Sequence, residues 1–165
     1  QRLGQPRLPQ ETVPEARFRE NVSRLFPRTA HEDHTRLWDI LCLQARQQHG
    51  SLVVIAEDAQ TEAQRLSSQA TPITPVLVTP ELFARASRVD GGLLLDPSGH
   101  CCAIGVVLDG EANDACKPSR GARYNSAVRY VHNLNARRMA IVYSDDRTLD
   151  VVPLLRPRVS RALIV

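Results

Sequence analysis

The spacing of apolar residues changes along this chain, and each change marks a new element. A continuous apolar run rich in β-branched residues, SLVVIAE at 51–57, predicts a buried strand. Apolar residues at helical spacing precede it and predict helices at 11–26 and 29–48. The later pattern predicts helices at 58–68, 79–86 and 120–133, an extended segment at 70–79, and strands at 92–96, 100–108, 140–143 and 149–153.

Residues at the expected helix starts agree with these boundaries. Thr29 and Glu32 have the spacing of a capping box, which would open the second helix. Asp58 suits the N-cap of the helix after the buried strand, and Thr79 followed by Pro80 suits the start of the next. Because buried strands alternate with helices, the sequence predicts an α/β sheet with helices packed on it.

Composition narrows the class of protein. The 165 residues, 42% hydrophobic and 24% charged, suit one globular domain. No apolar run approaches the roughly 20 residues that span a bilayer, so we expect no membrane segment. The net charge is +3 and the basic residues form no block of five, so we expect no nucleic-acid partner. The chain begins with Gln and ends on RALIV, so we expect a fragment of a longer protein, with a loose arm at 1–10.

The cysteines and histidines give little indication of a metal site. None of the four cysteines belongs to a CxxC pair, which argues against a zinc knuckle. Adjacent Cys101 and Cys102 would point to opposite faces of a strand as small core residues, so we expect a reducing, cytoplasmic location. His31 and His34 lie three residues apart, but the HExxH spacing is absent and a solvated first helical turn is favoured.

Asp90, Gly91 and Gly92 form the first candidate site, at a predicted helix-to-strand junction. Glycines there permit positive φ and let the backbone approach a ligand closely. A carboxylate beside such a backbone can hold Mg²⁺ or Mn²⁺, ions that suit nucleotide phosphates. Taken alone, the three residues are better explained as an ordinary turn.

The segment SRGARYNSAV is a candidate phosphate site at a helix start. Gly121 and Ala122 are small enough for phosphate oxygens to approach the backbone amides, and the helix dipole favours anions there. Arg123 can bind phosphate through two hydrogen bonds. The alternative is a helix start whose arginines are merely solvated.

YSDDRT at 143–148 supplies a hydroxyl and two carboxylates at a strand end. As an isolated hairpin turn this is commonplace. At the mouth of the same sheet, Ser144 could contact phosphate and Asp145 could share the metal.

Four segments, in this order, resemble the diadenylate cyclase (DAC) domain family over about residues 49–152. HGSLVVIAED resembles the family's opening strand, VDGGLLLDPSGHCCAIGVVL its Asp-Gly-Ala hairpin, RGARYNSAV its Gly-Thr-Arg-His-Arg helix start, and MAIVYSDDRTLDVV its closing hairpin. Members of the family convert two ATP molecules into the second messenger cyclic di-AMP. The resemblance implies a central mixed, mostly antiparallel β-sheet flanked by helices, with an N-terminal helical extension.

The predicted elements and the extent of the resemblance together suggest how the chain is organised. Residues 1–48 lie outside the resemblance and would form an arm and helices that pack on the sheet, 49–155 would form the nucleotidyltransferase domain, and 156–165 a C-terminal tail that we expect to be truncated. The resemblance implies ATP as substrate and Mg²⁺ or Mn²⁺ as cofactor. Because one domain offers one site, cyclisation would need a homodimer in which two sites face each other.

Functional roles follow at the positions that match. Asp90 would bind the metal that activates the ribose 3′-hydroxyl, and Arg123 would bind phosphate as the second catalytic residue. Asp145 would complete the metal surroundings. The nucleotide-binding positions would be Gly91, Gly92, Leu108, Gly121, Ala122, Arg123, Asn125 and Ser144.

The sequence departs from the family at the phosphate-binding helix start. Thr-Arg-His-Arg is replaced by Ala122, Arg123, Tyr124 and Asn125, so the second arginine is lost. Losing one charged phosphate contact costs on the order of 1.5–3 kcal/mol. Arg120 or Arg129 could substitute. The chain is therefore expected to be a divergent active cyclase. The alternatives, in order, are a cyclase with an altered nucleotide preference, a sensor that binds nucleotide without turnover, and a structural scaffold.

Overall fold

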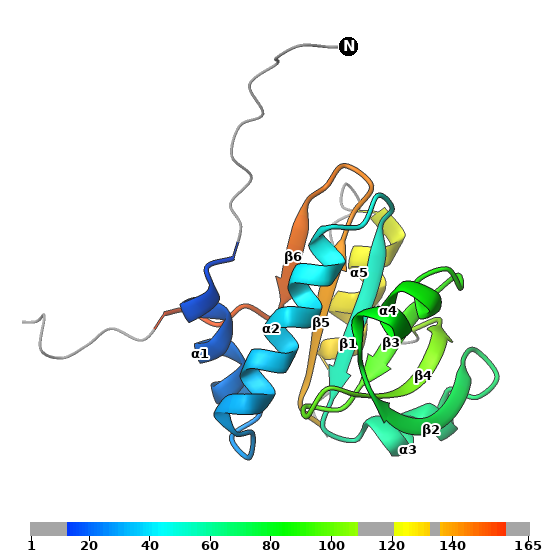
Figure 1. The fold of residues 1–165 in the computed structure, drawn as a ribbon, viewed down its shortest axis with the longest axis horizontal. Helices are drawn as coiled ribbons and strands as arrows, with labels where there is room; N and C mark the ends of the chain where they lie inside the picture. Colours follow the sequence, from blue (N-terminus) through cyan, green and yellow to red (C-terminus); the bar gives the residue numbers. More distant parts are fainter. Residues whose placement is uncertain (1–12, 109–120, 133–135, 158–165) are drawn as a thin grey trace, which may run out of the picture.

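The computed structural model describes residues 13–108, 121–132 and 136–157, and within them six strands form one sheet (Figure 1). The expected arm at 1–10, the irregular segment at 109–119 and most of the tail at 156–165 lie outside the described residues. The helices are α1 (Glu15–Leu25), α2 (His31–Ala45), α3 (Ala59–Arg65), α4 (Pro80–Ala86) and α5 (Gly121–Val131). The strands are β1 (Ser51–Ala56), β2 (Thr71–Leu77), β3 (Gly92–Leu95), β4 (His100–Val106), β5 (Arg138–Tyr143) and β6 (Leu149–Val152).

The sheet has the strand order β2-β4-β3-β1-β5-β6. At its centre, Val53 of β1 pairs with Leu93 of the parallel strand β3 and with Ile141 of the antiparallel strand β5. The remaining neighbours, β2 with β4, β3 with β4 and β5 with β6, are antiparallel. The mixed, mostly antiparallel sheet implied by the sequence is confirmed.

Both faces of the sheet are covered by helices, as Figure 1 shows. Leu52 and Val54 of β1 share a buried core with α3 and α5, whereas Val53 and Ile55 share another with α1, α2 and α4. A strand buried on both faces needs apolar residues at every position rather than at alternate ones. This explains the continuous apolar run from which β1 was predicted.

A buried polar cluster ties α3 and α5 to the sheet. Arg138 of β5 is 5% exposed and pairs with Glu62 of α3 at 2.8 Å and with Asp58 at 3.3 Å. The Tyr130 hydroxyl of α5 donates to Glu62 at 2.8 Å, and the Arg138 guanidinium lies 4.2 Å from the centre of the Tyr130 ring. The cluster fixes α5, the helix whose first turn carries Arg123.

Helices α1 and α2 belong to the same core as the strands, with Phe18 and Val22 fully buried against it. Asn21 of α1 is also buried, and its amide donates to the carbonyl of Pro153 at 3.0 Å and accepts from the backbone of Leu155 at 2.8 Å. These bonds tie the chain after β6 to α1. No helix in the described residues has the length and apolar character needed to cross a membrane.

The prediction of a capping box at Thr29 and Glu32 is wrong. Helix α2 begins two residues after Thr29, whose hydroxyl donates instead to the carbonyl of Phe26 at 2.6 Å, at the end of the preceding helix. Ala30 occupies the N-cap, and its backbone amide is satisfied by the Asp33 carboxylate at 2.8 Å. The helix therefore starts one residue too late for the Thr29 hydroxyl to cap it.

Other predicted helix boundaries lie closer to those of the structure. Thr79 caps α4 as expected, because its hydroxyl accepts from the backbone of Leu82 at 3.2 Å. Asp58 sits at the N-cap of α3, but its side chain makes no cap bond and pairs with Arg138 instead. Helices α2 and α3 each end three residues before their expected ends.

Candidate functional site

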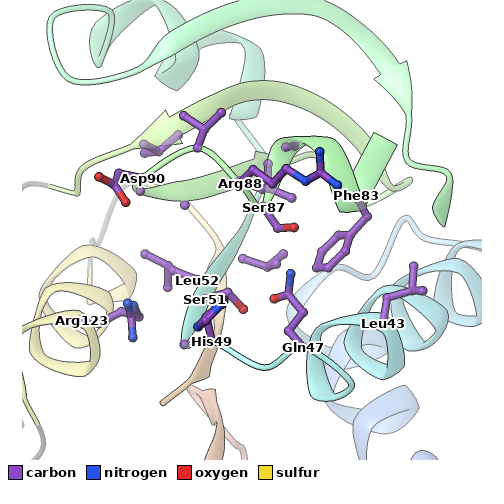
Figure 2. A pocket seen from close by; sticks show the side chains of 18 of the residues that line it. Leu43, Gln47, His49, Ser51, Leu52, Phe83, Ser87, Arg88, Asp90 and Arg123 are labelled. Carbon is purple, nitrogen blue, oxygen red and sulfur yellow. The ribbon is translucent and has the colours of Figure 1, made fainter. Parts of the chain in front are cut away.

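A cleft of about 1280 Å³ opens where α2 ends, β1 begins, α4 turns into β3 and α5 starts (Figure 2). Its volume exceeds the roughly 300–1,000 Å³ of typical small-molecule pockets, so it has room for a ligand of the size of a nucleotide. Figure 2 shows Asp90 and Arg123 at one end of the cleft and Gln47, Phe83 and Leu43 at the other. The site is therefore built from segments far apart in the sequence.

The cleft collects most of the expected site residues. Those that line it are Asp90, Gly91, Gly92, Leu108, Ala122, Arg123 and Asp145. Gly121, Asn125 and Ser144 are not among the lining residues. Ser144 serves its own turn, where its backbone amide donates to the carbonyl of Thr148 at 2.9 Å.

Asp90 is presented by a turn that only glycine can complete. Gly91 has φ +101°, and a Cβ at this position would lie 2.5 Å from the backbone carbon of Gly105. The two backbones are in contact, and this fixes the turn that precedes β3. The Asp90 side chain is exposed and makes no hydrogen bond or ion pair with any residue that the structure describes, so both carboxylate oxygens remain available to a ligand.

Arg123 lies across the start of β1. A Cβ on Gly50 would overlap its Nη1 atom and would lie 3.0 Å from its Cζ atom. The backbone amide of Gly50 donates to the Asp145 carboxylate at 2.8 Å, so this glycine contacts a cation from α5 and an anion from the β5–β6 turn. Arg123 is exposed and has no ion pair within the described part of the chain.

The second arginine expected from the family has no direct replacement in the described residues. Arg129 donates to the Ser126 hydroxyl at 3.3 Å and does not line the cleft, and Arg120 lies outside the described residues. Two other exposed arginines do line it, Arg46 at the end of α2 and Arg88 after α4. The cleft is thus more basic than the segment SRGARYNSAV alone indicates.

The sequence-based prediction missed the end of the cleft between α2 and α4. The side-chain amide oxygen of Gln47 and the Ser51 hydroxyl are buried there with no hydrogen-bond partner in the described residues, and Phe83 supplies an apolar wall. These residues belong to an ordinary helix end, strand start and helix face. No local pattern distinguishes them, so only the packing of α4 beside α2 could identify them.

The residues present could hold a divalent metal if a bound nucleotide supplied some of the metal's ligands. The described residues contain no group of three or more His, Cys, Asp or Glu side chains that could hold a metal. Mg²⁺ commonly binds one or two carboxylates and takes its other ligands from water and substrate phosphates. The Asp90 carboxylate, which has no hydrogen bond or ion pair within the described part of the chain, fits that use. His34, considered from the sequence as a metal ligand, is hydrogen-bonded to the Thr29 hydroxyl at 2.7 Å.

Comparison with known proteins finds a matching family and similar solved structures. The family described as DAC, DisA bacterial checkpoint controller nucleotide-binding, matches residues 42–151. A double mutant of DacA from Staphylococcus aureus has a similar crystal structure, with a TM-score of 0.56 and 16% identity over 79% of this chain and 88% of that one. A hypothetical membrane spanning protein from Bacillus cereus has a TM-score of 0.56 and 15% identity, over 76% of this chain and 61% of that one.

At these identities the two structures show the likeness of the fold alone. Comparison with curated protein sequences gave no match. The family match covers β1 through β5, both glycines after Asp90 and the start of α5. By this match the chain belongs to the DAC family of nucleotide-binding domains.

Proposed function

We propose that this domain is a metal-dependent nucleotidyltransferase that condenses two ATP molecules into cyclic di-AMP and releases two pyrophosphates. One observation carries the proposal: the Asp90 carboxylate and the Arg123 guanidinium line the same cleft, and neither is hydrogen-bonded or ion-paired to a residue that the structure describes. A carboxylate suits a cation and a guanidinium suits a phosphate, which together describe a nucleotide-metal site.

In each step the 3′-hydroxyl of one ATP attacks the α-phosphorus of the other. A new P–O bond forms, the bond to pyrophosphate breaks, and the hydroxyl proton leaves to solvent. A Mg²⁺ or Mn²⁺ ion held by Asp90 would lower the pKa of the hydroxyl and neutralise phosphate charge. The protein itself supplies position and charge: Arg123 neutralises phosphate oxygens, and the turn at Gly91 and Gly92 lets the backbone lie close to the nucleotide.

Cyclisation takes two such steps in opposite directions. A single cleft offers one Asp90 and one Arg123, so the proposal includes a homodimer in which two clefts face each other. It also includes a reducing cytoplasmic setting, where ATP is plentiful. The free thiols of Cys101 and Cys102 are consistent with that setting, and burial raises the pKa of each to about 11, so both are unreactive.

The test is incubation with ATP and Mn²⁺ or Mg²⁺ over a range of protein concentrations, with products identified by mass spectrometry. We expect cyclic di-AMP to rise more steeply than linearly with protein, because the active species is a dimer. Asp90→Asn should lower the rate by about 100-fold or more, since metal activation contributes several kcal/mol and each 1.36 kcal/mol is tenfold. Its melting temperature should stay unchanged because the carboxylate contacts no described residue. Near-normal turnover by this variant would refute the role of Asp90.

A sensor that binds nucleotide without turning it over is the second candidate. The observation that favours it is the loss of an arginine at Asn125, which does not line the cleft. A sensor would bind ATP or cyclic di-AMP in calorimetry and gain about 2.7 kcal/mol of stability at 100 times Kd, without releasing pyrophosphate. If the wild type releases pyrophosphate from ATP and the Asp90→Asn variant does not, this candidate is excluded.

A further inference from the structure

The loop between α2 and β1 brings together three residues that no sequence motif connects. Gly50 lies in this loop, Arg123 in the first turn of α5, and Asp145 in the β5–β6 turn, and all three line the cleft. The Gly50 amide donates to Asp145 Oδ1 at 2.8 Å. The Arg123 guanidinium lies against the Cα of Gly50, in the space that any other side chain would occupy.

The turn that presents Asp145 is itself well held. The amide of Ser144 donates to the carbonyl of Thr148 at 2.9 Å, and the amide of Thr148 donates to the Asp146 carboxylate at 3.0 Å. Asp145 is therefore fixed on one side by its own turn and on the other by Gly50. A fixed anion attracts a nearby guanidinium and so restricts where the guanidinium lies.

We propose that Gly50 and Asp145 are positioning residues for Arg123, and that Asp145 acts at the arginine rather than at the metal. Gly50 provides the space, and the Asp145 charge draws the guanidinium into it. Arg123 and Asp145 make no ion pair within the described residues, so the guanidinium keeps its donors for a phosphate. This inference rests on the proposed function, because it concerns how the domain holds the phosphates of ATP.

The contact at Gly50 predicts an unusual kind of variant. A Cβ at this position would lie below 3.0 Å from the Asp145 oxygen and from the Arg123 Nη1 atom, which real Cβ atoms do not tolerate. Both are ends of flexible side chains, so they can move aside without unfolding the protein. Gly50→Ala should therefore keep the fold and lose the position of the guanidinium.

A double-mutant cycle tests this with metal-free ATP, in excess EDTA, by calorimetry. We expect Gly50→Ala to weaken ATP binding about tenfold and Arg123→Ala by about 10- to 100-fold, the size of a charged hydrogen bond. The double variant should bind like Arg123→Ala alone, because Gly50 acts through that side chain. Wild-type affinity in Gly50→Ala, or effects that multiply in the double variant, would overturn the proposal.

Asp145→Asn separates positioning from metal binding. Asparagine keeps an acceptor for the Gly50 amide but removes the charge, so metal-free ATP should bind about fivefold more weakly, by the usual size of an exposed charge pair. Asp39→Asn is the control for loss of charge, since Asp39 is an exposed carboxylate of α2 that does not line the cleft. If Asp145→Asn leaves metal-free binding unchanged and only raises the Mn²⁺ concentration needed for activity, Asp145 is a metal ligand and the proposal is wrong.

A structural readout is independent of nucleotide. Crystal structures of the wild type and Gly50→Ala without ligand should show the guanidinium displaced from the start of β1 in the variant. An unmoved guanidinium would overturn the positioning role. Failure of the wild type to bind ATP would instead refute the proposed function, and these two structures would still decide what Gly50 does.

Discussion

Arg123 belongs to helix α5, and Arg138 of β5 packs against the same helix, but the two arginines have opposite surroundings. Arg138 is 5% exposed, pairs with two carboxylates and stacks on the Tyr130 ring. Arg123 is exposed, lies against Gly50 and makes no ion pair with any residue that the structure describes. One side chain is committed to the fold, and the other remains available to a ligand.

The difference shows how burial divides the charges of this domain between stability and binding. A buried guanidinium must be paired, because leaving it without a partner costs several kcal/mol. An exposed one is solvated, so it can keep its hydrogen-bond donors at little cost until a phosphate arrives. Changes to the two arginines should therefore affect different properties.

Arg138→Ala should have the largest effect, a loss of about 3–5 kcal/mol in the free energy of unfolding. It removes the buried partner of the Glu62 and Asp58 carboxylates, so that Glu62 keeps only the more exposed Arg65 as a cation among the described residues, and it removes the contact over Tyr130. Denaturant titration measures the loss. Arg129→Ala is the control, because that side chain bonds Ser126 on the surface of α5, and it should change stability by about 0.5 kcal/mol or less. Equal effects of the two changes would contradict the assignment of Arg138 to the fold.

Arg123→Ala should show the opposite pattern. ATP binding should weaken by about 10- to 100-fold, whereas the free energy of unfolding should change by about 0.5 kcal/mol or less. Calorimetry and denaturant titration on the same preparation give both values. A loss of stability similar to that of Arg138→Ala would mean that Arg123 belongs to the fold after all.

Tyr130→Phe removes one hydroxyl from the buried cluster. Its donation to Glu62 at 2.8 Å is lost, but Arg65 and Arg138 still contact that carboxylate. We expect a loss of about 1 kcal/mol, the usual net value of one hydrogen bond, seen as a lower denaturation midpoint with an unchanged slope. No change in the midpoint would show that the hydroxyl does not contribute.

The pH dependence of stability should give the smallest effect. Burial alone would raise the pKa of Glu62, but hydrogen bonds from Arg65 and Tyr130 and the charge of Arg138 outweigh it and leave the pKa below the ordinary 4.5. Because the folded pKa is the lower one, the stabilisation is complete above about pH 4.5 and is lost as pH falls through the folded value. Glu62→Gln should flatten this acid limb in thermal melts, and an identical limb in the variant would assign it to other groups.

The sequence was most informative where structure depends on neighbours in the chain. The apolar run of β1, the Thr79 cap and the turn at Asp90, Gly91 and Gly92 were all predicted in place. Each depends on side-chain spacing or on backbone conformation within a few residues. The predicted capping box at Thr29 was wrong because the N-cap lies one residue further on, at Ala30, and the Thr29 hydroxyl bonds the preceding helix end instead.

Site residues were predicted where they belong to a motif. Asp90, Arg123 and Asp145 line one cleft, whereas Ser144 remains in its own turn. Arg46 and Gln47 were missed, because nothing at the end of an amphipathic helix marks a residue that faces a ligand. Their position depends on α4 packing beside α2.

By itself the sequence determined the strands, the presence and order of the helices, the family and the two halves of the candidate nucleotide site. Only the tertiary structure decided that Gly50, Arg123 and Asp145 meet, and that Arg138 is buried while Arg123 is exposed. The physical reason is distance along the chain. Local patterns specify backbone conformation, but contacts between distant segments depend on how the sheet orders its strands and on which helix covers each face.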